Sequence, residues 1–244
     1  MNIKYLALET RRVIRAPRFL IFTVGFPVVF YLLFSNLYGN QGGAAEQAAT
    51  RAWIMAGMAA FGALTAAVST GTRIATERGA GWQRQLRLTP LSGGAYLVTK
   101  ALVGMLVSVG PLLLVCAVGA ATGVRLDAAA WAQLVIGTWL GLLPFAVLGV
   151  LIGQLSTPDS VQPIGSATFM LLSIGGGLWF PPELMPTWLN RLAHVLPSFW
   201  YGGIGRDAVG HQGVTMQTVL VLGVWTVGLA LVAARRYRAD TARV

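Results

Sequence analysis

The sequence predicts an all-α integral membrane protein with six transmembrane helices in a single domain, residues 1–244. Apolar stretches of about 20 residues recur along the chain, and that is the length a helix needs to cross a hydrocarbon core about 30 Å thick. The composition is 55% hydrophobic and 11% charged, which is too apolar to cover a soluble surface. The charged residues fall mainly in the short breaks between these stretches.

The first predicted element is an amphipathic helix that precedes the first span. Its apolar residues recur at helical spacing, and its charged residues fall mostly on the opposite face: Ile3, Leu6, Ala7, Val13 and Ile14 against Lys4, Glu9, Arg11, Arg12 and Arg15. Pro17 then interrupts the helix. We expect an elbow helix that lies along the cytoplasmic leaflet.

The six predicted spans follow in order, at residues 19–38, 53–72, 96–122, 131–155, 163–180 and 215–234. Pro27 and Pro111 predict kinks in the first and third spans. The fourth span carries two Gly-x-x-x-Gly pairs on one face, at Gly137, Gly141, Gly149 and Gly153. Such a face allows close helix approach, either within one subunit or between subunits.

A short segment between the fifth and sixth predicted spans has its own pattern. Pro181, Pro182 and Pro186 indicate a turn. An apolar stripe then extends to Pro197 through Met185, Trp188, Leu189, Leu192, Ala193 and Leu196. About ten residues cannot cross a membrane. We therefore expect short re-entrant or interfacial helices at the outer leaflet.

The basic residues predict the orientation. Most of the 18 Lys and Arg residues flank the spans on one side, in the N-terminal segment, the break after the second span and the C-terminal tail. The positive-inside rule then places both termini in the cytoplasm, with the chain in the plasma membrane. The net charge of +10 follows from this topology. It does not indicate nucleic-acid binding, because the charges flank spans and form no stripe with interleaved aromatic residues.

The chain lacks the sequence patterns for its own energy source. It has two lysines, Lys4 and Lys100, and neither follows the glycines of a P-loop. We therefore expect no cofactor, metal or nucleotide on this chain, and no enzymatic activity. The predicted spans contain no Asp, Glu, Lys or Arg except at their ends. This argues against ion-coupled transport, which usually depends on buried ionisable groups. Energy should come from a cytoplasmic partner.

The break between the second and third spans carries the most informative motif. It reads RIATERGAGWQRQLRLTPLSGGAYLVTK from Arg73 to Lys100. Its residues Glu77, Arg78, Gly81, Leu86, Thr89, Pro90, Leu91, Ser92 and Lys100 resemble the signature of type-2 (ABC-2) ABC exporter permeases. A second resemblance lies after the fifth span, at Gly176, Gly177, Phe180, Pro181, Glu183, Pro186 and Pro197. Trp82 departs from the family pattern, which more often has a smaller residue there.

The resemblance implies a half-transporter. Two permease subunits, identical or related, would pair around a central pathway, and each would rest on a cytoplasmic ATPase subunit that binds ATP and Mg. The ATPase contact would comprise Glu77, Arg78, Gly81, Trp82, Leu86, Thr89 and Pro90. The first, second and fifth helices would line the pathway through Phe26, Phe30, Phe34, Thr65, Ser69, Phe169 and Ser173, although packing within one subunit explains these residues equally well. Pro181, Glu183, Pro186 and Pro197 would form the outer-leaflet turn.

The substrate and the competing functions follow from the same residues. An apolar pathway with scattered Ser and Thr suits an amphiphilic or hydrophobic molecule such as a drug, an antibiotic or a lipid, so efflux and antibiotic resistance are the expected roles. Membrane lipids are expected partners. A non-transporting scaffold or sensor that anchors a cytoplasmic partner is the alternative. An ABC importer is disfavoured because its Glu-Ala-Ala loop is absent from the sequence.

Overall fold

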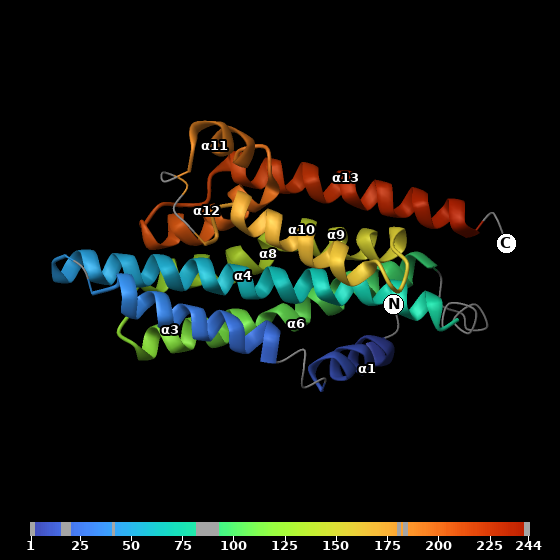
Figure 1. The fold of residues 1–244 in the computed structure, drawn as a ribbon, viewed down its shortest axis with the longest axis horizontal. Coiled ribbons are helices and arrows are strands. Elements are labelled where there is room, and N and C mark those ends of the chain that lie inside the picture. Colours follow the sequence, from blue (N-terminus) through green and yellow to red (C-terminus); the bar gives the residue numbers. More distant parts are fainter. Residues whose placement is uncertain are drawn as a thin grey trace.

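The computed structural model is a helical bundle, and it describes residues 3–15, 21–40, 42–81, 93–179, 182 and 185–241. The helices lie roughly alongside one another (Figure 1). No strand occurs in these described ranges. The predicted all-α class is confirmed.

The described residues of the first half of the chain, 3–15, 21–40, 42–81 and 93–121, form five helical elements. They are α1 (Ile3–Ile14), the π-helical turn η1 (Ile21–Gly25), α3 (Phe26–Tyr38), α4 (Ala44–Gly79) and α6 (Gly93–Ala121). The second half forms α7 (Ala128–Ala132), a second π-helical turn η2 (Gln133–Gly137), α8 (Thr138–Gly141), α9 (Leu143–Leu155), α10 (Val161–Gly175), α11 (Thr187–Ala193), α12 (Pro197–Val209) and α13 (Met216–Thr241).

Within the described residues, four helices are long and apolar enough to cross a membrane. They are Ala44–Gly79, Gly93–Ala121, Ala128–Leu155 and Met216–Arg238. The predicted first and fifth spans coincide with the shorter apolar helices Thr23–Tyr38 and Val161–Gly175. The number of crossings therefore stays a prediction.

Helix α4 lies at the centre of the bundle and is much longer than the predicted second span. Its 36 residues correspond to a length of about 54 Å, which exceeds the hydrocarbon thickness of about 30 Å. Its buried face is rich in alanine, including Ala56, Ala59, Ala60 and Ala63. Small side chains there let α3, α6, α9 and α12 pack closely around it.

The glycines of the fourth span serve packing within this chain. A Cβ added to Gly149 would lie 2.6 Å from the carbonyl oxygen of Val68 in α4. A Cβ on Gly153 would meet the Gly71 backbone, also in α4, and a Cβ on Gly137 or Gly141 would meet Ile204 in α12. Because backbone approaches backbone at the α4–α9 crossing, larger residues do not fit there.

The predicted fourth span is not one regular helix. It begins at Asp127, whose side chain accepts a hydrogen bond from the Ala130 backbone N–H at 2.7 Å. It then passes through the π-helical turn η2 and is interrupted at Leu142, shortly before Pro144. Proline lacks the N–H that an α-helix requires and clashes with the preceding turn. The sequence predicted a continuous span here, so this interruption was not expected.

The prolines of the first and third spans meet at one point. Pro27 is the second residue of α3, which follows η1 directly, and Pro111 lies inside α6, which continues through it. A Cβ on Gly62 would lie 2.9 Å from the Pro27 ring and 3.1 Å from Pro111. These prolines therefore pack against α4.

The segment before α13 contains two short helices. Trp188 and Leu192 on α11 are largely exposed. The sequence predicts short helices in this segment, but it places Pro197 at the end of the apolar stripe. Instead Pro197 lies at the start of α12, where its missing N–H costs nothing. The fully buried Tyr201 donates a hydrogen bond from its hydroxyl to the Ala60 carbonyl at 2.9 Å, so α12 is anchored to α4.

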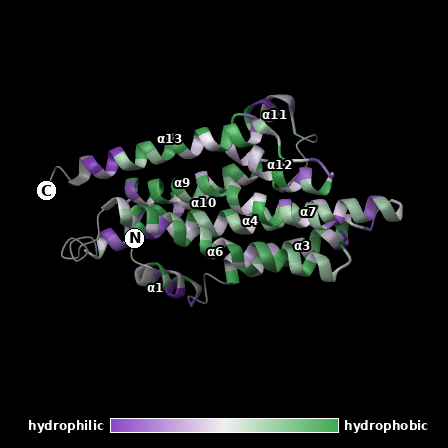
Figure 2. Ribbon diagram, turned by 180° about the vertical axis from the view of Figure 1, so that it is seen from behind, coloured by the Kyte–Doolittle hydropathy of each residue, from purple (hydrophilic) through white to green (hydrophobic). Residues whose placement is uncertain are grey.

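Different helices form the two ends of the bundle (Figure 1). Helix α1 and the C-terminal parts of α4 and α13 lie at one end, and α11 and α12 lie at the other (Figure 1). Hydrophobic residues cover the length of the bundle between them, and hydrophilic residues gather toward the helix ends (Figure 2). The exposed face of α13 is apolar, with Val219, Leu220, Val224 and Val227 each more than half exposed. Such a surface suits contact with lipid.

Candidate functional site

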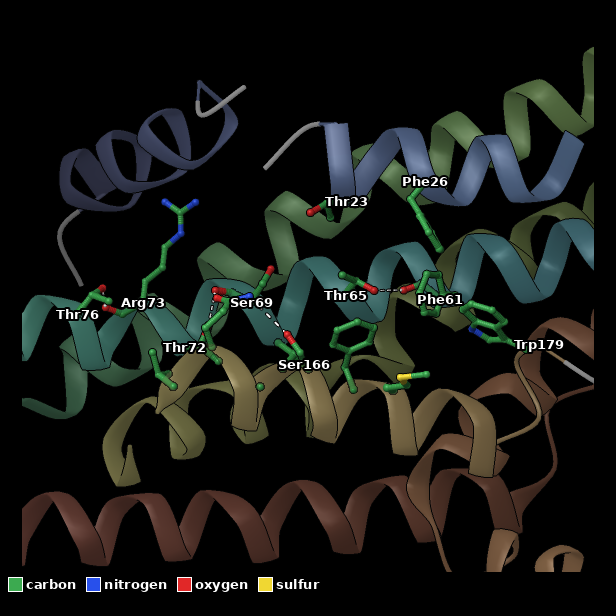
Figure 3. Close-up of a pocket in the computed structure, with 16 residues that line it drawn as sticks. Thr23, Phe26, Phe61, Thr65, Ser69, Thr72, Arg73, Thr76, Ser166 and Trp179 are labelled. Atoms are coloured by element: carbon green, nitrogen blue, oxygen red, sulfur yellow. Dashed lines mark hydrogen bonds between the residues drawn. The ribbon is translucent and has the colours of Figure 1, made fainter. Parts of the chain in front are cut away.

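A cavity of about 820 Å³ lies along one face of α4. That face contributes residues at helical spacing: Phe61, Thr65, Val68, Ser69, Thr72, Arg73 and Thr76. The rest of the wall comes from the start of the first span (Thr23, Phe26), from α10 (Val161, Gln162, Gly165, Ser166, Phe169, Met170) and from Trp179. Figure 3 shows these side chains between α3 and α10.

One end of the cavity is aromatic. The ring centroid of Phe61 lies 5.3 Å from that of Trp179, 5.9 Å from that of Phe169 and 5.9 Å from that of Phe26. These spacings are within the favourable range for aromatic pairs. Four rings from separate segments therefore form an apolar surface at this end.

The middle of the cavity carries hydroxyl groups that are already bonded to their own helix. Thr65 donates to the Phe61 carbonyl at 2.8 Å, Ser69 to the Ala66 carbonyl at 3.2 Å, and Thr72 to the Ser69 carbonyl at 2.8 Å. A hydroxyl bonded in this way is compatible with an apolar neighbour, since its proton has an acceptor. This wall is mildly polar, and its hydroxyl groups do not need water as a hydrogen-bond acceptor.

The other end of the cavity is charged. Arg73 and Thr76 line both this cavity and a smaller one of about 270 Å³, whose remaining lining residues are Glu9, Arg12 and Glu77. The Arg73 side chain extends from α4 toward α1 (Figure 3). The charged end of the large cavity thus adjoins α1.

Behind this end lies a buried charge cluster that joins three helices. Lys100 Nζ of α6 lies 2.7 Å from Glu9 Oε2 of α1 and 2.6 Å from Glu77 Oε1 of α4. The Tyr96 hydroxyl donates to Glu77 Oε2 at 2.7 Å. The Lys100 side chain is 2% exposed, and the carboxylate side chains are 9% and 10% exposed. Helix α1 is therefore fixed to α6 by the Glu9–Lys100 ion pair.

This cluster changes two expectations from the sequence. Glu9 was assigned to the polar face of α1, and Lys100 was counted with the basic residues that flank the spans; both side chains are buried instead. Both charges can be buried because Glu9 and Lys100 compensate each other in an ion pair. The available signal was Lys100 itself, which stands inside the predicted third span and so required a partner.

The structure describes three of the residues predicted to contact an ATPase. Glu77 is paired with Lys100, and Arg78 donates from Nη1 to the carbonyl oxygen of Gln154 in α9. Gly81 follows α4 with a φ of 74°, which glycine adopts readily. Trp82, Leu86, Thr89 and Pro90 lie outside the described residues. Glu77 and Arg78 are therefore engaged within the chain, and the contact itself stays a prediction.

The predicted pathway residues divide into two groups. Phe26, Thr65, Ser69 and Phe169 line the large cavity. The other three, Phe30, Phe34 and Ser173, are not among its lining residues. The Phe30 ring stacks on Phe26 with centroids 4.1 Å apart, and the Phe34 ring meets Phe30 edge-on at 5.3 Å. The buried Ser173 hydroxyl donates a hydrogen bond to the Phe169 carbonyl oxygen at 2.7 Å. Their role in transport stays a prediction.

The charged end of the cavity was not predicted from the sequence. Thr72, Arg73 and Thr76 continue the face of α4 that holds Thr65 and Ser69. Their helical spacing was visible in the sequence, but Arg73 was assigned to the loop because α4 was expected to end at residue 72. The helix in fact continues to Gly79.

The predicted outer turn is described in part. Pro186 is exposed at the start of α11, and Pro197 is buried at the start of α12. Pro181 and Glu183 lie outside the described residues. Among the residues that are described, no group of His, Cys, Asp and Glu could hold a metal ion.

Comparison with known proteins gives two matches. The family model described as "ABC-2 type transporter" matches residues 5–208. The chain is also 30% identical over 218 residues to the "Putative transport permease YvfS" of Bacillus subtilis (strain 168), with 88% of this chain and 87% of that protein covered.

Proposed function

Since this chain belongs to the ABC-2 type transporter family, we propose that it is the permease subunit of an ATP-driven exporter for an amphiphilic or hydrophobic substrate. The proposed substrate classes are drugs, antibiotics and lipids. ATP and Mg would bind to a separate cytoplasmic ATPase, present in two copies, and a second permease chain would complete the transporter.

The large cavity is the observation that carries this proposal. Its volume of about 820 Å³ falls within the range of sites for drug-sized ligands. Its wall combines four aromatic rings with hydroxyl groups, as recognition of a partly apolar molecule requires. It also lies on helices α3, α4 and α10, which the family resemblance assigns to the pathway.

The arrangement of the bundle supports the proposed orientation in the plasma membrane. Helix α1, the end of α4 and the end of α13 lie at the same end of the molecule (Figure 1). We propose that this end is cytoplasmic, since the basic residues near it agree with the positive-inside rule. The ATPase would then dock beside α1 and the loop at residues 82–92.

Reconstitution with the cognate ATPase tests the proposal. The permease and ATPase are incorporated into proteoliposomes, and ATP hydrolysis and export are measured across a panel of lipophilic compounds. We expect at least one compound to stimulate hydrolysis and to be transported. Binding of the ATPase without stimulation or transport by any compound would support a non-transporting scaffold instead.

The docking surface is tested by replacing apolar residues of the loop. Trp82→Ala together with Leu86→Ala should reduce co-purification of the ATPase. Glu77→Ala is a poor probe, because it would remove a partner of the buried Lys100. Trp188→Ala is the matched control, since Trp188 is 65% exposed on α11 at the opposite end of the bundle. An ATPase complex that survives the double substitution would refute this docking surface.

A further inference from the structure

The large cavity has a polarity that narrows the substrate class. Its aromatic end and its charged end are separated along α4, from Phe61 to Thr76. Fifteen residue steps along a helix correspond to about 22 Å, which is roughly three quarters of the hydrocarbon thickness. A ligand that contacts both ends must therefore be elongated, with an apolar part and a polar part.

The charge at the polar end is positive. Arg12, Arg73 and Lys100 face Glu9 and Glu77 in this region, so three cations and two carboxylates give a formal charge of +1. Both oxygens of Glu77 already accept hydrogen bonds, from Lys100 and from Tyr96. The carboxylates are thus committed to partners within the chain.

Arg73 is the group best placed to bind an anion. It lines both cavities and experiences the charges of Arg12, Glu77 and Glu9. A guanidinium has five N–H donors, so it can keep contacts within the chain and still bind a phosphate or carboxylate in a bidentate manner. A cationic ligand would meet a net positive charge here.

We infer that this cavity binds an elongated anionic amphiphile, with its head group at Arg73 and its tail against Phe26, Phe61, Phe169 and Trp179. This inference rests on the proposed function for its biological role and adds the sign of the head group. The ligand chemistry is a phosphate or carboxylate on a long apolar tail. Its source is either a membrane lipid or a free amphiphile.

A competition experiment with the purified full-length permease tests the inference. A tritiated alkyl phosphate is bound in nonionic detergent and displaced by unlabelled alkyl phosphate, lysophosphatidylglycerol, lysophosphatidylcholine or alkyltrimethylammonium, all with the same tail. We expect the anionic ligands to bind about tenfold more tightly than the cationic one, as one charge-assisted contact implies. The tighter of the two anionic ligands identifies the source.

Substitutions separate the two ends of the site. Arg73→Gln should weaken binding of the anionic ligands about tenfold and leave the cationic ligand unchanged or improved, because a charge-assisted hydrogen bond is lost. Arg73→Lys should restore much of the preference. Phe169→Ala should weaken all ligands alike, because it removes tail contact. Arg235→Gln is the control, since Arg235 is an exposed arginine in the last two turns of α13.

Two results would overturn the inference. One is equal affinity of the wild-type protein for the anionic and cationic ligands. The other is an Arg73→Gln protein that remains monodisperse yet loses all ligands equally, which would indicate a structural role for Arg73. Because this assay omits the ATPase, it can fail while ATP-driven export of other compounds succeeds. Conversely, Arg73-dependent binding without export would remove the proposed function and leave the binding site.

Discussion

Removing the charge of Lys100 should destabilise this protein strongly. The Lys100 ammonium lies within 2.7 Å of two carboxylates and is 2% exposed. Lys100→Met would leave Glu9 and Glu77 facing each other without a cation in a region from which water is largely excluded. Loss of one partner of a buried ion pair typically costs about 3–5 kcal/mol. For a chain of this size that cost corresponds to a decrease of about 6–20 °C in the unfolding midpoint.

The order of the variants is more informative than any single value. Glu9→Gln should destabilise the protein less than Lys100→Met, because it leaves the Lys100–Glu77 ion pair, whose net charge is zero. Lys100→Met should cost much less in a Glu9→Gln, Glu77→Gln background than in the wild type, since no buried carboxylate then lacks its cation. Arg235→Met is the matched control, and a shift within about 0.5 kcal/mol is expected for an exposed site.

The assay is thermal unfolding of the detergent-solubilised permease. Intrinsic fluorescence reports the midpoint, and size-exclusion chromatography after heating reports the surviving folded fraction. All variants are heated at one scan rate, because the midpoint depends on scan rate when unfolding is irreversible. Two results would contradict the predicted cost of unpaired buried carboxylates. One is an equal decrease of the midpoint by Lys100→Met in the wild type and in the Glu9→Gln, Glu77→Gln background, and the other is a decrease no larger than that caused by Arg235→Met.

Two further predictions concern helix packing and pH. Gly149→Leu should abolish most of the folded protein, because even a Cβ there would lie 2.6 Å from the Val68 carbonyl oxygen. Gly228→Leu is the control and should express normally, because its position has open space. Comparable yields of the two variants on size-exclusion chromatography would contradict the close crossing of α4 and α9. The hydrogen bond from the Ala130 backbone N–H, and to a smaller extent the neighbouring His211, lowers the pKa of Asp127 below its ordinary value of 3.8. The ionised Asp127 therefore stabilises the fold at pH above 3.8, and this stabilisation is lost as the pH falls through the lowered pKa. Asp127→Asn should therefore reduce the decline of the unfolding midpoint between about pH 5 and pH 2, and an unchanged decline would contradict this assignment.

Much of the fold could be predicted because hydropathy acts locally. Each apolar stretch reports its own preference for lipid or for a protein interior, whatever it packs against. The helices at 93–121 and 216–241 accordingly lie close to the spans expected from the sequence. The family signature was likewise readable, because residues such as Glu77, Gly81 and Pro90 are recognised by their order along the chain.

Helix ends and interruptions were harder to predict, because hydropathy is local and these features depend on contacts with other helices. Helix α4 continues past Thr72 to Gly79, since its polar last turns are held against α6 and α9 by the contacts of Glu77 and Arg78. A hydropathy pattern ends where polar residues begin. It does not record the partners that allow polar residues to remain helical.

The sequence alone determined that this is an apolar, helical membrane protein with a basic side and the signature of a transporter permease. The tertiary structure decided which face of α4 lines the cavity, that Arg73 belongs to it, and that Glu9 and Lys100 form a buried pair. Glu9 and Lys100 are 91 residues apart in the sequence. Their pairing depends on how α1, α4 and α6 are rotated about their own axes, and that rotation is fixed by side-chain packing among all three helices.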